Sequence, residues 1–226
     1  MQPFRLPRSD SHRPTLWLFD LDDTLHNATP VIFERMNRSM TEYVMRHVGL
    51  DEPAANALRR EYWMRYGATL LGLMVRHGTR PDHFLAETHQ FPDMRAIIDF
   101  DKRVRPLLKH LPGRKVLVSN APLHYVEQVL ASMRVGGHLH AIETIESMRY
   151  VPKPARSSLS RILRRHGAAG PRPRVVMVED NLDNLRTAKR LGLTTVWISK
   201  AAHKPAFVDY RFRSVLQLAR GRPARA

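Results

Sequence analysis

The sequence predicts an α/β fold, a doubly wound parallel sheet with an inserted α-helical cap. Three observations support this prediction. Short, continuously apolar runs recur along the chain, as expected for strands that are buried on both faces of a parallel sheet. Amphipathic helical patterns follow the later runs, so strand and helix alternate. The alternation is interrupted once, after the first strand, by a long stretch that carries helical patterns only.

The predicted strands are β-rich runs bounded by polar residues. Four of them stand out and a fifth is weaker. The runs are TLWLFD (15–20), KVLVSN (115–120), RVVMVED (174–180) and TTVWIS (194–199), with HAIETI (140–145) as the weaker candidate. The first three end in acidic or amide residues. Because open α/β sheets bind ligands at the carboxyl ends of their strands, chemistry is expected there.

Three helices are expected between the later strands. The first is expected at Pro122, which suits a first helical position, and its apolar stripe ends before Gly136. The other two stripes, 159–166 and 182–191, are each followed directly by a glycine, a common helix stop. These helices complete the alternation that a doubly wound sheet requires.

The interruption is predicted to be a helical insertion. Thr29-Pro30 is a favourable helix start, and several later segments end in glycine. Since the insertion leaves the sheet at the carboxyl end of the first strand, it should stand over the ligand crevice. The predicted organisation is a cap (29–103), a core (15–28 and 104–219) and two basic tails (1–14 and 220–226).

Composition limits the class of protein. The 226 residues, of which 43% are hydrophobic, fit one domain or one domain with an insertion. The absence of cysteine excludes disulfides, thiolate metal sites and cysteine nucleophiles. No apolar targeting segment opens the sequence and no run is long enough to span a bilayer. A soluble cytoplasmic protein, monomeric or homodimeric, is therefore expected.

The formal charge of +16 could attract nucleic acid, anionic lipid or small anionic substrates. The basic residues are spread along the chain, and no long basic block is interleaved with aromatic residues. This favours a generally basic surface over a dedicated nucleic-acid interface.

Acidic residues cluster where two predicted strands end. Asp20 and Asp22 are two positions apart, so in extended geometry both face one side. Glu179 and Asp180 repeat the arrangement after a later strand. If these strands are neighbours, three or four carboxylates converge, a density of hard oxygen ligands that suits Mg²⁺. Carboxylates so close repel one another, so a positive charge is expected among them.

Other polar groups are predicted at the same edge. Ser119 and Asn120 precede a helix start, a favourable place for an anion, although they could equally serve as a helix cap. Lys153 lies between two prolines, which restrict the backbone on each side and fix the position of its charge. A nucleophile, a second carboxylate, a hydroxyl, a lysine and a cation pocket suit phosphoryl transfer through an aspartyl-phosphate.

These segments resemble a known family. DLDDT (20–24), Ser119, Lys153 and EDNLDN (179–184) resemble, in order, the four motifs of haloacid dehalogenase (HAD) superfamily phosphatases. The resemblance implies a HAD-like Rossmannoid core, with Asp20 as nucleophile and Asp22 as general acid and then base. It also implies that Ser119 and Lys153 bind phosphate. The dehalogenases of this superfamily lack the second Asp, so Asp22 favours cleavage of phosphate esters.

The same resemblance implies a magnesium site. Asp180 and the Asp20 carboxylate would bind the ion together with the backbone carbonyl of Asp22. Glu179 would act through water or by supporting another ligand. Asn184 occupies a position where the fourth motif often ends in an acid or amide, and its role stays open.

The insertion resembles a narrower group. YWMRYGATLLGLMVRHG (62–78) and HFLAETH (83–89) resemble the helical cap of pyrimidine 5′-nucleotidases. This implies UMP and CMP as leading substrates. The residues that it places near the base are Tyr66, Thr69, Leu73, Met74 and His77, with His89 as a further candidate. Leu73 and Met74 could equally be core between cap helices, and the histidines could be surface or helix-end groups.

Together these inferences predict a Mg²⁺-dependent phosphomonoester hydrolase of the 5′-nucleotidase type, acting on a small phosphorylated substrate. Asn120 is predicted to bind that substrate together with Ser119, Lys153, Tyr66, Thr69 and His77. The alternative within the fold is a phosphatase or phosphomutase for sugar phosphates or other small phosphomonoesters. A basic nucleic-acid-binding protein that retains the fold without catalysis is the third possibility.

Overall fold

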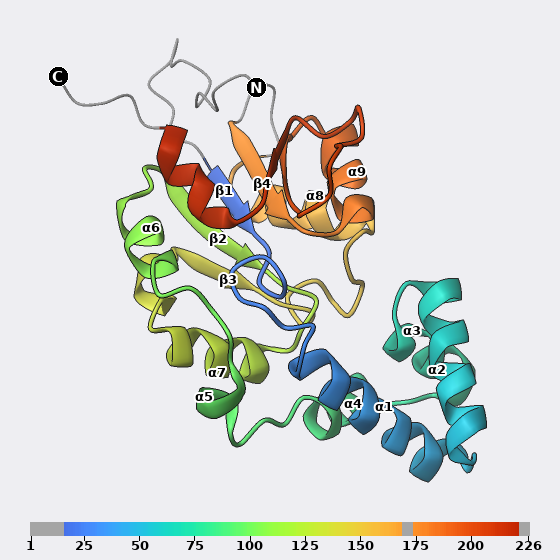
Figure 1. Ribbon diagram of the computed structural model, residues 1–226. Coiled ribbons are helices and arrows are strands. Elements are labelled where there is room, and N and C mark those ends of the chain that lie inside the picture. Colours follow the sequence, from blue (N-terminus) through green and yellow to red (C-terminus); the bar gives the residue numbers. More distant parts are fainter. Residues whose placement is uncertain (1–15, 169–173, 222–226) are drawn as a thin grey trace, which may run out of the picture.

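The structure, a computed structural model, describes residues 16–168 and 174–221 of the chain. The predicted N-terminal tail, and the predicted C-terminal tail from residue 222, lie outside the described residues. A sheet lies between two layers of helices, and a separate group of helices stands beyond one end of it (Figure 1).

Six parallel strands form one sheet in the order β3-β2-β1-β4-β5-β6. The strands are β1 (Leu16–Phe19), β2 (Arg114–Val118), β3 (Ala141–Glu143), β4 (Val175–Glu179), β5 (Thr194–Ile198) and β6 (Tyr210–Phe212). The doubly wound parallel sheet is thereby confirmed. Five strands coincide with predicted runs, whereas β6 had not been predicted because its three residues, Tyr-Arg-Phe, carry no apolar run.

The strand order reverses at β1. From this central strand the chain passes to β2 and β3 on one side, and later to β4, β5 and β6 on the other. Phe19, the last residue of β1, pairs with Leu117 of β2 and Val178 of β4. The three strands therefore end almost level, and the crevice expected at such a switch point lies at their carboxyl ends.

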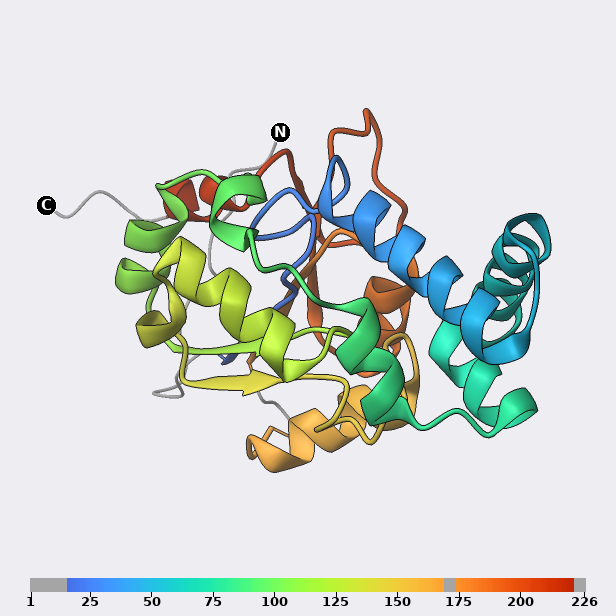
Figure 2. The ribbon, with the colours of Figure 1, turned by 90° about the horizontal axis from the view of Figure 1, so that it is seen from below.

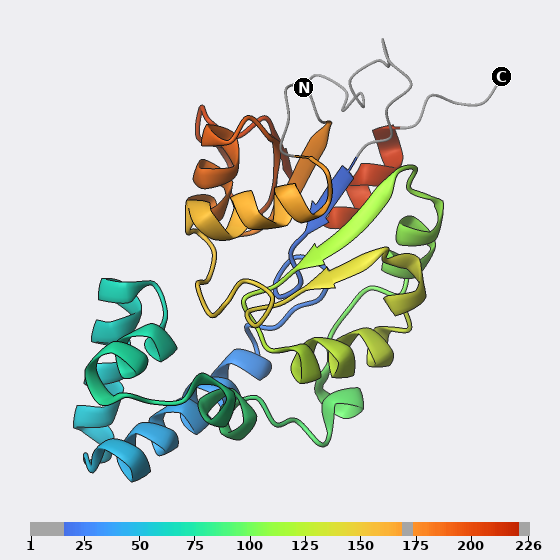
Figure 3. The same ribbon diagram turned by 180° about the vertical axis from the view of Figure 1, so that it is seen from behind.

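Helices cover both faces of the sheet (Figures 1 and 3). The core helices are α6 (Val104–His110), α7 (Leu123–Met133), α8 (Arg156–Arg165) and α9 (Leu182–Arg190), with 3₁₀ turns η1 (Gly136–His138) and η2 (Val215–Gly221). Successive residues of β1 point to opposite faces. Trp17 and Phe19 join the apolar cluster under α6 and α7, whereas Leu16 and Leu18 join the cluster under α8 and α9.

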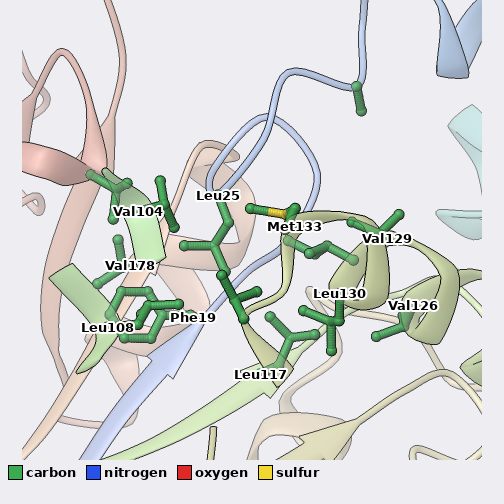
Figure 4. Packing of buried hydrophobic residues seen from close by; sticks show 14 of the residues in the cluster. Phe19, Leu25, Val104, Leu108, Leu117, Val126, Val129, Leu130, Met133 and Val178 are labelled. Atoms are coloured by element: carbon green, nitrogen blue, oxygen red, sulfur yellow. The ribbon is translucent and has the colours of Figure 1, made fainter. Parts of the chain in front are cut away.

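The first of these clusters lies under the carboxyl ends of the central strands. Phe19, Leu117 and Val178, from three adjacent strands, lie against Leu108 and Leu130 (Figure 4). All five side chains are at most 3% exposed. Truncating Phe19, Leu108, Leu117 or Leu130 to alanine would cost about 2–5 kcal/mol, so the residues that follow these strands project from a well-packed base.

The helical insertion contains five helices in the described chain. They are α1 (Ile32–Val48), α2 (Glu52–Tyr66), α3 (Thr69–His77), α4 (Pro81–Thr88) and the short α5 (Met94–Ile97). Figure 3 shows α1 to α4 beyond one end of the sheet, and Figure 2 shows α2 and α3 farthest from the core. Helix α1 packs against α2 and α4, and α2 packs against α3. Helix α5 lies instead against α7 of the core.

Two predicted helix starts and one predicted helix end lie a few residues from the positions in the structure. Helix α1 begins at Ile32, after Thr29-Pro30. Pro122 is the N-cap of α7 and lies outside the helical geometry. The same helix ends at Met133, before the predicted glycines, because Arg134 adopts a left-handed conformation and its N–H bonds the preceding turn. The longest helix, α1, has 17 residues, and none of the described helices is long and apolar enough to cross a membrane.

Candidate active site

Polar side chains from four parts of the chain meet beyond the carboxyl ends of β1, β2 and β4. Asp20 directly follows β1, Ser119 and Asn120 follow β2, and Glu179 ends β4. The loop between β3 and α8 adds Lys153. The residues predicted for chemistry that line one shared cavity are Asp20, Asp22, Ser119, Asn120, Lys153, Glu179, Asp180 and Asn184.

Lys153 is the positive charge among the carboxylates. Its ammonium Nζ donates to Asp20 Oδ1 at 2.7 Å, to Glu179 Oε2 at 2.8 Å and to the backbone carbonyl of Val118 at 2.8 Å. All three donors of the ammonium are therefore used. The lysine side chain is 1% exposed, so the two ion pairs are held away from solvent and fixed in geometry.

Asn120 holds the backbone of this lysine. Its side-chain oxygen accepts from the Lys153 N–H at 2.8 Å, and its side-chain N–H donates to the Lys153 carbonyl at 3.0 Å. The Ser119 hydroxyl oxygen accepts from the Ala121 N–H at 3.0 Å. The two residues after β2 thus have different surroundings: Asn120 ties the lysine loop to β2, and Ser119 lies at the start of the segment leading to α7.

The electrostatics of the cluster favour an added cation. Burial, followed by the charge of Glu179, raises the pKa of Asp20 to about 7. Burial also raises the pKa of Glu179 to about 7 and, with the charge of Asp20, that of Asp180 to about 6. Burial lowers the pKa of Lys153, but the two carboxylates outweigh it and the net shift is upward. One ammonium thus faces three carboxylates that are costly to ionise.

The donor set fits a divalent, oxygen-binding metal. Carboxylate oxygens of Asp20, Glu179 and Asp180, which together form the acidic cluster, all lie within 4.8 Å of one another. Glu179 already accepts from Lys153 and, through Oε1, from the Asn181 N–H at 3.2 Å. Asp20 and Asp180 are therefore the better placed ligands. Hard oxygen groups in this number are typical of Mg²⁺ sites, in which waters supply the remaining positions.

Asp22 is held by two side chains that sequence reasoning missed. The hydroxyl of Tyr125, on α7, donates to Asp22 Oδ1 at 2.6 Å, and His26 Nε2 lies 2.9 Å from the same oxygen. Burial and the Asp22 charge raise the pKa of Tyr125, so its hydroxyl stays protonated and remains a donor. Oδ2 of Asp22 has no hydrogen bond to any described residue.

Asp23, the third acid of the DLDDT motif, accepts hydrogen bonds from the backbone of the following turn. Its Oδ1 accepts from the N–H groups of Ala28 at 2.8 Å and Thr29 at 3.0 Å, and Oδ2 accepts from the Thr29 hydroxyl. It does not line the cavity. Asp23 therefore fixes the turn that carries the chain from β1 toward α1, and the three neighbouring acids have three different environments.

The cavity extends from the strand ends to the helical insertion. Its volume is about 550 Å³, within the range of small-ligand sites. The insertion contributes apolar side chains such as Phe33, Met36, Met40 and Trp63, and the polar residues Asn37, Arg59 and Thr69. Arg59 donates to Asn37 Oδ1 at 2.7 Å and has no carboxylate partner among the described residues.

The residues predicted to lie near a substrate base divide into two groups. Thr69 and His89 line the cavity. Tyr66 and His77 are not among its lining residues, and both pack against Tyr62, whose hydroxyl lies 2.8 Å from His77 Nε2. Leu73 and Met74 are also outside the lining. Leu73 is fully buried in the core between the helices, and Met74 packs against that core.

Two further contacts support the site. His89 is buried with its ring against Tyr125, and its Nδ1 lies 2.8 Å from the Thr88 hydroxyl. Burial lowers the pKa of His89 to about 3, so it is neutral at physiological pH. On the other side, the indole N–H of Trp197, in β5, donates to the backbone carbonyl of Asp180 at 2.7 Å. Neighbouring elements therefore support Asp22, through Tyr125, and the backbone of Asp180.

Comparison with known proteins identifies the family. The family model described as a haloacid dehalogenase-like hydrolase matches residues 15–192. The chain is a haloacid dehalogenase-like hydrolase. The match covers β1, the insertion and every strand end that contributes to the acidic cluster.

Solved structures of haloacid dehalogenase-like proteins share the fold at low identity. A HAD phosphatase from Thermococcus onnurineus is 17% identical, with a TM-score of 0.62 over 90% of this chain and 95% of that one. The L-2-haloacid dehalogenase of Xanthobacter autotrophicus with covalently bound chloropropionic acid is 14% identical, with a TM-score of 0.56 over 92% and 99%. The magnesium-bound HAD-hydrolase YfnB of Bacillus subtilis is 17% identical, with a TM-score of 0.55 over 91% and 97%.

One curated relative extends the comparison of sequences. Phosphate metabolism protein 8 of Saccharomyces cerevisiae is 26% identical over 119 residues. The aligned part is 51% of this chain and 36% of that protein. This haloacid dehalogenase-like hydrolase therefore matches only about a third of the length of its curated relative.

Binding of Mg²⁺ should depend on pH, because its ligands must lose protons. The pKa values of Asp20 and Glu179 are raised to about 7, and that of Asp180 to about 6. The affinity for Mg²⁺ should therefore fall as the pH drops from 8 to 6. The expected loss is up to about tenfold per pH unit for each proton displaced. Calorimetric titration in two buffers of different ionisation enthalpy would measure the affinity and the protons released. An affinity that is constant across this range would contradict the expectation, and Asp180→Asn should weaken binding at every pH.

Proposed function

We propose that this hydrolase cleaves phosphomonoesters through an aspartyl-phosphate on Asp20, with Mg²⁺ held by Asp20, Asp180 and the backbone carbonyl of Asp22. The observation that carries the proposal is the Lys153 ammonium between Asp20 and Glu179 at the end of an open cavity. This arrangement keeps a carboxylate nucleophile next to a fixed positive charge. When bound, Mg²⁺ would neutralise charge on the phosphoryl oxygens. Bound magnesium in the structurally similar YfnB is in keeping with this choice of metal.

Asp20 is the proposed nucleophile because its Oδ2 has no hydrogen bond to any described residue, whereas both oxygens of Glu179, the other partner of Lys153, are engaged. One oxygen, Oδ1, is fixed by Lys153, and Asp20 lines the cavity. Attack by a carboxylate oxygen on phosphorus would form the acyl phosphate while the P–O bond to the leaving group breaks. The Ser119 hydroxyl would donate to a phosphoryl oxygen, and the fixed charge of Lys153, whose three donors are already used, would attract the phosphoryl oxygens electrostatically. Glu179 would keep the lysine in place, and Asn120 would do so through the lysine backbone.

Asp22 is the proposed proton carrier. Both its hydrogen bonds are to Oδ1, so Oδ2 is available to give a proton to the leaving oxygen. The same oxygen would then take a proton from the water that hydrolyses the acyl phosphate. Tyr125 and His26 prevent rotation of the carboxyl group, and general acid–base catalysis depends on such positioning.

Residues 29–103 are proposed to act as a cap over the substrate. They contribute about half of the cavity lining, which includes the apolar residues of α1. The two connections, near Thr29 and Asp99, are joined by the Asn27 N–H to Asp99 carbonyl bond at 2.8 Å. Movement about these connections would admit substrate and then exclude water from the acyl phosphate.

Pyrimidine nucleoside monophosphates, UMP and CMP, are the proposed substrates. The cavity offers apolar surface and the exposed indole of Trp63 for a planar base. Arg59, which has no carboxylate partner among the described residues, offers donors for base carbonyl groups. The resemblance of the insertion to pyrimidine 5′-nucleotidases supports this choice over other small phosphomonoesters.

A substrate panel tests the specificity. With saturating Mg²⁺, release of phosphate from UMP and CMP should exceed that from sugar phosphates by at least about tenfold in kcat/KM, the effect of roughly one specific contact. Purine nucleotides serve as the size control. If sugar phosphates are hydrolysed faster than every pyrimidine nucleotide, the nucleotidase assignment is wrong, whereas the hydrolase chemistry would stand.

Substitution of the nucleophile tests the chemistry. Asp20→Asn should lower kcat by at least about 10³-fold, because the neutral amide is a poor nucleophile. Circular dichroism should show that the variant keeps the fold. Asp23→Asn is the matched control: it changes a neighbouring carboxylate that lies outside the cavity and should retain activity within about tenfold. An Asp20 variant with near-normal turnover would contradict covalent catalysis by this residue.

Loss of the tyrosine hydroxyl tests the role assigned to Asp22. Tyr125→Phe removes the 2.6 Å bond to Asp22 Oδ1 but leaves the cavity lining unchanged. Loss of a hydrogen bond to a charged group costs about 1.5–3 kcal/mol, so kcat should fall by about tenfold or more. KM should stay within about twofold of its original value, since Tyr125 is not expected to contact substrate. A rise in KM with unchanged kcat would argue against this positioning role.

A further inference from the structure

We propose a second metal site, for a zinc-class transition metal, formed by His47, His83 and Glu87 where α1 crosses α4. The site lies within the helical insertion and shares no residue with the acidic cluster at the strand ends. It would take a cation that prefers imidazole nitrogen, whereas the acidic cluster offers oxygen only.

The three side chains already face one another. His83 and Glu87 are one turn apart on α4, with His83 Nε2 2.8 Å from Glu87 Oε1. His47, near the end of α1, places its Nε2 3.6 Å from Glu87 Oε2. All three ligand atoms lie within 4.8 Å of one another. Ligands bound at about 2.0–2.1 Å in a tetrahedron are separated by about 3.4 Å, so small side-chain rotations would complete the site.

A neighbouring tyrosine fixes one ligand in a suitable orientation. The Tyr43 hydroxyl lies 3.0 Å from His83 Nδ1, which leaves Nε2 directed at Glu87. Metal-binding histidines usually engage their second ring nitrogen in this way. A hydroxyl can donate or accept, so it would accept from Nδ1–H when Nε2 binds a cation. Tyr43 is buried and its ring packs on both His47 and His83.

Arg46 is the cation that a metal ion would have to displace from Glu87. Its guanidinium donates to Glu87 Oε2 at 2.7 Å, and its side chain is 54% exposed. An exposed ion pair of this kind contributes little to stability. The guanidinium can therefore move into solvent when a divalent cation takes its place, and the histidines, 39% and 48% exposed, are accessible to the ion.

Such a site would connect the last turn of α1 to α4 within the insertion. Helix α1 follows the chain from β1, and α4 precedes the return to the core. A cation bound to both would hold these helices together independently of the packing between them. The site is separate from the proposed catalytic chemistry, so each proposal can fail without the other.

Zinc titration of the untagged full chain tests the proposal. In excess Mg²⁺ and after removal of other metals, calorimetry should show one Zn²⁺ per chain at this site. At a hundredfold excess of Zn²⁺ over Kd, Tm should rise by about 5 °C or more. His47→Ala/His83→Ala should abolish both effects, while His203→Ala, which removes an exposed histidine elsewhere, should preserve them.

Co²⁺ provides a second measurement that does not depend on stability. Its visible d–d absorption should indicate nitrogen and oxygen coordination in the original protein, and Glu87→Gln should weaken that signal at least tenfold. Zinc binding that survives the double histidine substitution, or that is lost equally in His203→Ala, would overturn the proposal. So would an unchanged Co²⁺ spectrum in Glu87→Gln when circular dichroism shows the variant to be folded.

Discussion

A buried lysine between two carboxylates is the interaction on which the site depends. The ammonium of Lys153 would be very costly to bury alone, and so would Asp20 and Glu179. Together they are held by hydrogen bonds of 2.7 and 2.8 Å. Because removing one partner would leave a buried charge without compensation, the three positions constrain one another. The sheet must therefore bring β1, β4 and the loop after β3 to one place.

The parallel sheet meets this requirement through its strand order. With β1 central and paired to both β2 and β4, the residues after these strands project into the same crevice. The chain also leaves the sheet for the insertion at this edge, where Asp23 organises the turn. One edge thus supplies the charged groups, and the insertion supplies much of the apolar lining of the cavity. In the proposed function, chemistry and selection of substrate would therefore fall to different parts of the fold.

Much of this arrangement could be predicted from the sequence because its signals are local. Buried strands appear as apolar runs, and the acids that follow them mark the ends of those strands. Lys153 was predicted as a counter-charge from its flanking prolines and its order in the chain. Tyr125 could not be predicted, since it lies 103 positions from Asp22 and its helical stripe looks like ordinary core. The role of Asn120 was missed for a similar reason, because its partners are backbone atoms 33 positions away.

The insertion was harder to predict in detail. Its helices were expected, but which faces turn toward the cavity depends on tertiary packing. Tyr66 and His77 belong to the motif that resembles a nucleotidase cap, yet they pack around Tyr62, whereas Asn37, Arg59 and Trp63 line the cavity. Helical periodicity gives a helix two or more plausible faces, and only the crossing of α1, α2 and α3 decides between them.

The contact between Trp197 and Asp180 has a spectroscopic consequence. An indole whose N–H is bonded to the backbone of a proposed metal-binding residue senses changes in the local electric field. With only three tryptophans in the chain, and this one 8% exposed, its emission should change in colour or intensity when the acidic cluster gains a cation. Trp197 is thus an intrinsic fluorescent probe that is joined to the proposed metal site by one hydrogen bond.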